Sequence, residues 1–281
     1  MTKTNLQFFE MPDFGAISAL KQPKTVSTHC GVVKIENFLY SHYAWISGNV
    51  FPVSTLLNRR GFVFMAKSLA SQERTQSLGE EIANGVSHGI GFLAAVAVSP
   101  VLVVSAVQRG SSAGIVGASV FAFTMVLLYL TSTLYHTLPR NKAKRVFHVL
   151  DHGAIFLLIA GTYTPFTLGV LRGAWGWTLF GLVWGIAVVG VVLKSIGGVR
   201  YQRLSTILYL AMGWLIIIAV KPLWLNMPSW GMFWLVAGGA AYTAGVGFYA
   251  AKRIRYAHFV WHLFVIAGTA CHFIAVLRYA I

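Results

Sequence analysis

Long apolar runs dominate the chain from about residue 80 onward. Each is long enough to cross a hydrocarbon core of ~30 Å as a helix that rises ~1.5 Å per residue. Helices satisfy their own backbone hydrogen bonds in lipid, whereas a membrane barrel would show short alternating strands. The pattern therefore predicts an all-α bundle of seven transmembrane helices. The seven runs are 86–107, 113–138, 147–171, 175–195, 204–224, 230–251 and 257–279.

The first 79 residues differ from the rest. They mix charged, polar and aromatic positions, and no run among them reaches the ~18 apolar residues that a spanning helix needs. They also lack the basic, apolar and small-residue order of a signal peptide. We expect residues 1–79 to be a weakly ordered or peripheral extension and residues 80–281 to be the membrane domain. A specific hypothesis is that translation naturally starts at Met65, so that residues 1–64 are an upstream extension.

The composition agrees with a protein that lies within a membrane. It is 57% hydrophobic and 10% charged, whereas soluble domains carry about a quarter charged residues. The net charge of +15 could suggest nucleic acid, but the basic residues occur in short clusters between apolar runs. Such clusters fit loops that face a negative membrane surface. We therefore expect a multi-pass protein of the plasma (inner) membrane, with membrane lipids and not nucleic acid as its partners. No sequence feature indicates a protein partner or an oligomeric state.

The basic residues also predict an orientation. The even connections between runs hold ten Lys and Arg residues, and the odd connections hold three. Because positive charges are retained on the cytoplasmic side, the even connections are predicted to be cytoplasmic. The N-terminus is then cytoplasmic and the C-terminus outside. The residues counted are Arg140, Lys142, Lys144, Arg145, Lys194, Arg200, Arg203, Lys252, Arg253 and Arg255 against Arg109, Arg172 and Lys221.

This topology brings polar residues from four helices to one depth near the cytoplasmic face. Asp151 is the only acidic residue between Ile82 and Ile281, and an acid is costly to bury in a membrane. A bound metal ion would offset that cost. The converging residues are Glu81, Asn84 and His88 from the first helix, Ser132 and His136 from the second, Asp151 from the third, and His258 and His262 from the seventh.

The histidine spacing fits a metal site. His258 and His262 are four residues apart, which places both imidazoles on one helical face. His136 can supply a third imidazole from the second helix. Three histidines with an open fourth position are the pattern of a catalytic zinc site, where the metal lowers the pKa of bound water to ~7. The charge of the metal would also keep Asp151 ionised.

The remaining polar residues have candidate roles around such a metal. Asp151 is positioned to orient the water or to act as a general base, and Ser132 to steady the water or a substrate oxyanion. Glu81, Asn84 and His88 share one helical face and are candidates to support the ligands. Other interpretations stay open at this point. A histidine near the membrane surface can simply bond a carbonyl, and Glu81 can be an acid favoured by the helix dipole. The ion can also be a divalent metal other than zinc.

Four blocks of the sequence resemble the hemolysin III family, in the same order. That family groups with the progestin and adiponectin receptors and, more distantly, with the alkaline ceramidases. The resemblance covers roughly residues 78–281. The blocks are Glu80-Glu-Ile-Ala-Asn84-Gly-Val-Ser-His88, Ser132-Thr-Leu-Tyr-His136, the run from Val149 to Pro165, and His258-Phe-Val-Trp-His262.

The resemblance implies a seven-helix fold with its N-terminus inside and zinc on the cytoplasmic side of the bundle. His136, His258 and His262 would be the zinc ligands, and Asp151 and Ser132 would hold the water. Our first functional hypothesis is a zinc-dependent hydrolase of a lipid amide or ester. The second, which follows the family name, is a haemolysin that permeabilises membranes. The third is a receptor-like regulator of membrane lipid state.

Overall fold

The structure is a computed structural model that describes residues 75–198 and 201–281. The expectations for the N-terminal extension before residue 75, including a start at Met65, lie outside these residues. Within the described part, seven helical segments are long and apolar enough to cross a membrane. The predicted all-α fold with seven spans is therefore confirmed. The spans are Leu78–Gln108, Ser112–Thr137, Lys142–Leu171, Gly173–Gly197, Gln202–Asn226, Ser229–Ala250 and Ala257–Tyr279.

The first span is α3 (Leu78–Gln108), and a capping box fixes where it begins. The Ser77 side chain accepts from the backbone of Glu80, and the Glu80 carboxylate accepts in return from the Ser77 backbone at 2.9 Å. This exchange satisfies donors that would otherwise be unpaired at a helix start. The helix therefore begins well before the apolar run at residue 86. After a short turn, α4 (Ser112–Thr137) packs along α3.

The third span begins earlier than its apolar run suggests. Asn141 caps α5 (Lys142–Pro165), with its side-chain oxygen 2.9 Å from the backbone nitrogen of Lys144. The basic residues that follow Asn141 therefore form the first turn of a helix and not a connecting loop. At Pro165 the helix passes into a π-helical turn, η3 (Phe166–Leu171), and α6 (Gly173–Gly197) follows.

The fifth span is built from three pieces. These are α7 (Gln202–Trp214), the 3-10 turn η4 (Leu215–Ala219) and α8 (Val220–Asn226). The hydroxyl of Tyr163, from α5, lies at the break between α7 and η4. It accepts from the Ile216 backbone nitrogen at 2.9 Å and is 2.8 Å from the Met212 carbonyl oxygen. A buried hydroxyl thus satisfies backbone groups where the helix is interrupted.

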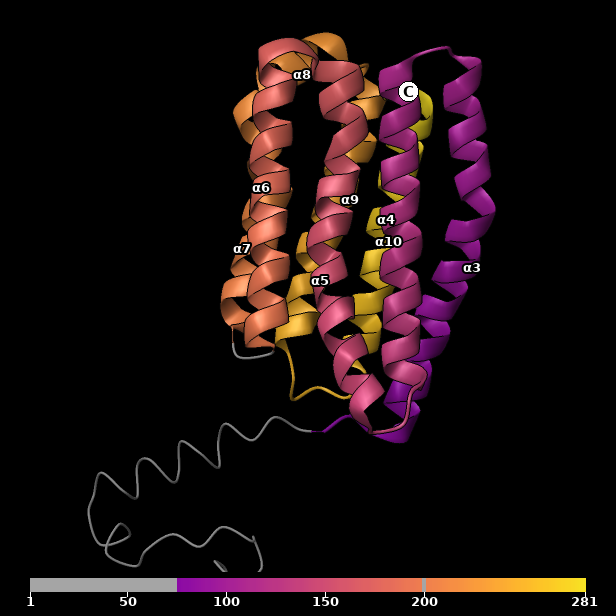
Figure 1. The fold of residues 1–281 in the computed structure, drawn as a ribbon, viewed down its shortest axis with the longest axis vertical. Coiled ribbons are helices and arrows are strands. Elements are labelled where there is room, and N and C mark those ends of the chain that lie inside the picture. Colours follow the sequence, from indigo (N-terminus) through magenta and orange to yellow (C-terminus); the bar gives the residue numbers. More distant parts are fainter. Residues whose placement is uncertain (1–74, 199–200) are drawn as a thin grey trace, which may run out of the picture. The chain divides into compact units, whose positions relative to one another are not determined.

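The last two spans, α9 (Ser229–Ala250) and α10 (Ala257–Tyr279), complete the bundle. In order, α3, α4, α5, α6, α7, α9 and α10 each contact the next, and α10 returns to α3 (Figure 1). The start of α3, the end of α4 and the starts of α5 and α10 lie at one end of this ring. The chain's C-terminus lies at the other end. Which end faces the cytoplasm stays a prediction.

A glycine allows a close contact between α4 and α5. Gly161 on α5 faces Thr124 of α4, and a Cβ at this position would collide with the threonine side chain. Small residues of this kind allow membrane helices to approach closely. The contact packs α5, which carries Asp151, closely against α4, which carries His136.

Candidate metal centre

Three histidines meet at the end of the bundle where α4 ends and α10 begins. His136 comes from the last turn of α4, and His258 and His262 come from the first two turns of α10. One ring nitrogen from each can be chosen so that all three lie within 4.8 Å of one another. The ring centroids of His258 and His262 are 4.7 Å apart, as expected for neighbours on one helical face.

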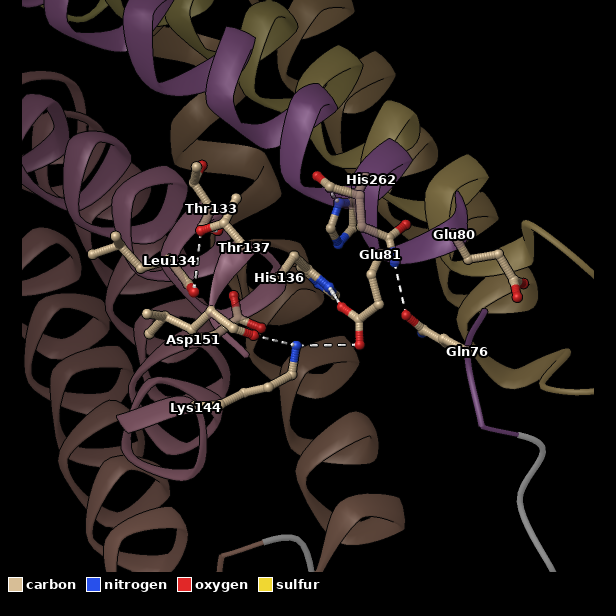
Figure 2. Close-up of polar contacts among 12 residues, drawn as sticks. Gln76, Glu80, Glu81, Thr133, Leu134, His136, Thr137, Lys144, Asp151 and His262 are labelled. Atoms are coloured by element: carbon tan, nitrogen blue, oxygen red, sulfur yellow. Dashed lines mark hydrogen bonds and ion pairs between the residues drawn. The ribbon is translucent and has the colours of Figure 1, made fainter. Parts of the chain in front are cut away.

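In two of these rings, His136 and His262, Nδ1 is hydrogen-bonded to an oxygen atom of the protein. His136 Nδ1 is 2.8 Å from a carboxylate oxygen of Glu81, and this contact is drawn in Figure 2. His262 Nδ1 is 3.3 Å from the backbone oxygen of Asn84. Because a carbonyl oxygen only accepts, Nδ1 of His262 must donate, and a neutral ring then carries its lone pair on Nε2. The Glu81 carboxylate favours the same arrangement at His136.

The Nε2 atoms of His136, His258 and His262 are buried and have no hydrogen-bond partner in the described part of the chain. Three buried imidazole nitrogens without partners in neighbouring rings are costly unless something binds them. Metal-bound histidines commonly donate their second nitrogen to a carboxylate or carbonyl, as His136 and His262 do here. The group can therefore hold a metal ion, and the donor set suits one that prefers imidazole.

Lys144 is a part of this centre that the sequence analysis assigned only to topology. Its Nζ is 3.2 Å from the second oxygen of Glu81, so that Lys144, Glu81 and His136 form a series (Figure 2). Nζ is also 3.3 Å from the carbonyl oxygen of Leu138. One feature of the sequence could have indicated that Lys144 lies at the centre. Lys144 precedes Asp151 by two helical turns and therefore shares its face of α5.

The structure places Asp151 and Ser132 beside each other. Asp151 lies on α5 and is 4% exposed, and Ser132 lies on α4 one turn before His136 and is fully buried. The Ser132 hydroxyl neighbours the Asp151 carboxylate, but it makes no hydrogen bond of good geometry within the described residues. Both groups thus remain available to a molecule bound at this end of the bundle.

His88 packs directly against the three-histidine group. Its ring is stacked on His262 with centroids 3.6 Å apart, and its other side meets the edge of Tyr129. Asn84, one turn earlier, contributes its backbone oxygen to His262, while its side chain donates to Gln76 at 2.8 Å. All three residues proposed from α3 to support the ligands, including Glu81, therefore lie at the centre.

A hydrogen-bond series that sequence reasoning missed approaches Asp151 from the polar surface. Gln202 donates to the Tyr249 hydroxyl at 2.7 Å, and that hydroxyl is 3.5 Å from His152 Nε2. His152 Nδ1 is 3.0 Å from the carbonyl oxygen of His148 and 3.6 Å from a carboxylate oxygen of Asp151. These residues come from three helices, and no spacing along the chain indicates that they meet.

Two cavities border the centre. An apolar cleft begins at His88 and Asp151 and runs between α5, α7 and α9 to Trp214 and His272. A polar pocket at the end of the bundle reaches His258 and Glu81. Its remaining lining is Thr75, Gln76, Glu80, Tyr135, Arg140, Lys144, His148, His152, Gln202, Phe248, Tyr249, Lys252, Ile254 and Ala257. The centre thus lies between a compartment that fits hydrocarbon and one that fits water.

The fold and this centre define a multi-pass integral membrane protein with a three-histidine group, able to hold a metal, at one end of a seven-helix bundle. The family model described as "Haemolysin-III related" matches residues 76–273, and the chain belongs to that family.

Curated relatives support this assignment. The chain is 43% identical to "Hemolysin-3" of Bacillus cereus over 207 residues, which are 74% of this chain and 94% of the relative. It is 45% identical to "Hemolysin-3 homolog" of Bacillus subtilis (strain 168) over 205 residues, or 73% of this chain and 96% of the relative. A weaker similarity, 28% over 172 residues, links it to human "Monocyte to macrophage differentiation factor", covering 58% of this chain and 69% of that protein.

Proposed function

We propose that this protein is a zinc-dependent hydrolase that cleaves an amide or ester bond in a membrane lipid. His136, His258 and His262 would bind the zinc ion. The observation that carries the proposal is the set of three buried, unpartnered Nε2 atoms between an apolar cleft and a polar pocket. Three neutral imidazoles are a ligand set that suits zinc, and they leave a coordination position open.

The two cavities argue for a lipid substrate. The lining of the cleft is mostly aliphatic and aromatic, and it includes Leu128, Ile155, Leu158 and Val265. A hydrocarbon chain in this cleft would place its polar end near Asp151. The polar pocket gives water a separate route to the same point. Substrate and water would thus reach the centre from opposite sides, as hydrolysis of a lipid within a bilayer requires.

The chain's own residues would then carry the reaction. When bound, zinc would supply a Lewis acid that polarises the substrate carbonyl and makes water a better nucleophile at neutral pH. Asp151 would accept the proton of the attacking water as general base and later return it to the leaving group. The Ser132 hydroxyl would donate to the negative charge that develops on the substrate oxygen. Glu81 would hold the ring of His136 in the required orientation.

Metal analysis of the purified protein tests the zinc site. Mass spectrometry should find close to one zinc per chain in the natural protein and a large loss in His136→Ala, His258→Ala and His262→Ala. His148→Ala is a matched control, because His148 lies at the same end of the bundle but outside the three-histidine group. Zinc-free natural protein, or zinc that persists in all three variants, would refute the site.

Turnover tests the reaction. Purified protein in nanodiscs should release fatty acid from one member of a panel of ceramides, N-acyl amides and phospholipid esters. Asp151→Asn should abolish this release while zinc content remains. If no lipid is cleaved by zinc-loaded protein, the hydrolase is wrong and the zinc has another role.

The names of the two bacterial relatives favour a second candidate, permeabilisation of membranes. A water-filled pore needs polar side chains along the length of several helices. In the described part of the chain the charged groups of the core gather at one end, and the cleft is apolar. Dye release from liposomes of pure phospholipid separates the two candidates. Leakage that His258→Ala does not alter would favour permeabilisation.

A further inference from the structure

His272 is a buried imidazole far from the three-histidine group. It lies on α10 and is 8% exposed. It borders the far end of the apolar cleft and also a second apolar cavity, which continues toward Leu223 and Met232. It is not among the metal ligands predicted from the sequence, and it is not part of the candidate centre.

The protein holds one edge of the His272 ring. Nε2 is 3.1 Å from the carbonyl oxygen of Leu235 on α9. Next to it, Gly238 packs so closely on the Cδ2–Nε2 edge that a Cβ at this glycine would collide with the ring. Because a carbonyl only accepts, Nε2 carries the proton, and the neutral ring has a lone pair on Nδ1. Nδ1 lies on the opposite side of the ring from Cδ2, away from Gly238.

That lone pair has no hydrogen-bond partner in the described part of the chain. The hydroxyls nearby are already engaged. The Thr162 hydroxyl donates to the carbonyl of Leu158 at 2.8 Å. The Tyr163 hydroxyl donates to the Met212 carbonyl near the end of α7. The Tyr242 hydroxyl is hydrogen-bonded to the Thr269 hydroxyl at 2.8 Å. The lining of the cleft around His272 is otherwise mostly aliphatic and aromatic. A single hydroxyl donor on a largely apolar ligand would pair this buried acceptor.

We propose that Nδ1 of His272 accepts a hydrogen bond from a hydroxyl group within the hydrocarbon chain of a lipid bound in the cleft. The position of that hydroxyl follows from α10. His272 is ten residues beyond His262, so that the two are about 15 Å apart along a helix that rises ~1.5 Å per residue. The ligand is therefore a long-chain lipid with a hydroxyl near the middle of its chain. This inference rests on the proposed function only in placing the polar end of the lipid at the three-histidine group.

Binding of free fatty acids tests the inference without turnover. The probes are stearic acid, 12-hydroxystearic acid and 2-hydroxystearic acid, added to the full chain in nanodiscs and measured by competition in native mass spectrometry. The two hydroxy acids have the same composition, but only the first carries its hydroxyl near His272. We expect 12-hydroxystearic acid to bind about tenfold more tightly than the other two, because it pairs a buried acceptor.

A variant assigns the preference to the imidazole. In His272→Phe the affinities for stearic and 12-hydroxystearic acid should become equal, while that for stearic acid changes little. The ratio of the two affinities is read within one protein, so that a general loss of stability does not imitate the result. Equal affinities in the natural protein, or a preference that persists in His272→Phe, would overturn the inference.

The same ratio separates this inference from the proposed hydrolase. Asp151→Asn, which should lose turnover but keep zinc and the three histidines, should keep the preference for 12-hydroxystearic acid. A natural protein without zinc that shows the preference would refute the hydrolase alone. A zinc-loaded, active protein without the preference would refute the hydroxyl site alone.

Discussion

At the three-histidine centre, the group bonded to Nδ1 determines which imidazole nitrogen is free. Glu81 does this for His136, and the Asn84 carbonyl does it for His262. Both partners come from the first two turns of α3, whereas the imidazoles belong to α4 and α10. One helix therefore contacts the candidate ligands on two others, through the Glu81 side chain and the Asn84 backbone.

Glu81→Ala should weaken zinc binding by about 10–100-fold, as expected when the partner of a metal-bound histidine is lost. The zinc affinity of Glu81→Gln should lie between those of Glu81→Ala and the natural protein, because an amide oxygen still accepts from His136 Nδ1 but carries no charge. Competition with a fluorescent chelator measures the affinity. Unchanged affinity in Glu81→Ala would show that the contact does not orient His136.

Lys144→Met should have a smaller effect. Its ion pair with Glu81 is partly exposed to solvent, and such pairs contribute ~1 kcal/mol or less, which corresponds to about fivefold in affinity. The same chelator assay applies, with Lys142→Met as the control, since Lys142 lies in the same turn and is exposed. Lys144→Met should add nothing in a protein that already carries Glu81→Ala.

Among the helices, the start of α3 has a second task besides orienting ligands. The Glu80 carboxylate completes the capping box of α3 and also accepts from the Tyr256 backbone nitrogen at 2.8 Å. Tyr256 is the N-cap of α10 and has a left-handed backbone conformation, with φ 59°. One buried carboxylate thus joins the beginnings of two helices that border the three-histidine group.

Glu80→Ala should lower the stability of the bundle by roughly 1–3 kcal/mol, because it removes a cap and leaves buried donors unpaired. Glu80→Gln should cost less, since its oxygen can accept one of these bonds. Thermal unfolding in detergent, followed by circular dichroism, gives the order of the melting temperatures. Arg253→Ala, an exposed position in the connection before α10, is the control. Equal melting temperatures for Glu80→Ala and this control would contradict the linking role.

For the molecule as a whole, polar groups are concentrated at one end of the ring of helices in the described part of the chain. The three-histidine centre, the polar pocket and the basic connections lie at this end, and the apolar cleft extends from it into the bundle. The positive charges predict that this end faces the cytoplasm. Water for the proposed reaction would then come from the cytoplasm, and the lipid from within the membrane.

Cysteine labelling in intact cells measures this orientation. In a protein with Cys30 and Cys271 replaced by Ser, a membrane-impermeant maleimide should label Ser112→Cys, at the first residue of α4. It should label Pro139→Cys, between α4 and α5, only after the cells are permeabilised. Both positions are exposed. The reverse pattern would place the metal centre outside the cytoplasm.

Some features of the protein followed from the order of its residues. A segment in lipid must satisfy its own backbone, so that each long apolar run had to be a helix of sufficient length. Helical geometry then placed His258 and His262 on one face, and alternation of the spans brought His136 to the same end. These inferences need only the periodicity of a helix and the count of crossings, and the structure agrees with them.

Other features depended on how each helix is rotated about its axis. In a membrane protein the surfaces toward lipid and toward neighbouring helices are both apolar, so that hydropathy does not distinguish them. The contact of Lys144 with Glu81, the stacking of His88 on His262 and the approach of Tyr249 to His152 all require that rotation. The cleft and the free nitrogen of His272 require it as well, because a cavity is formed by side chains from several helices that are far apart in the chain.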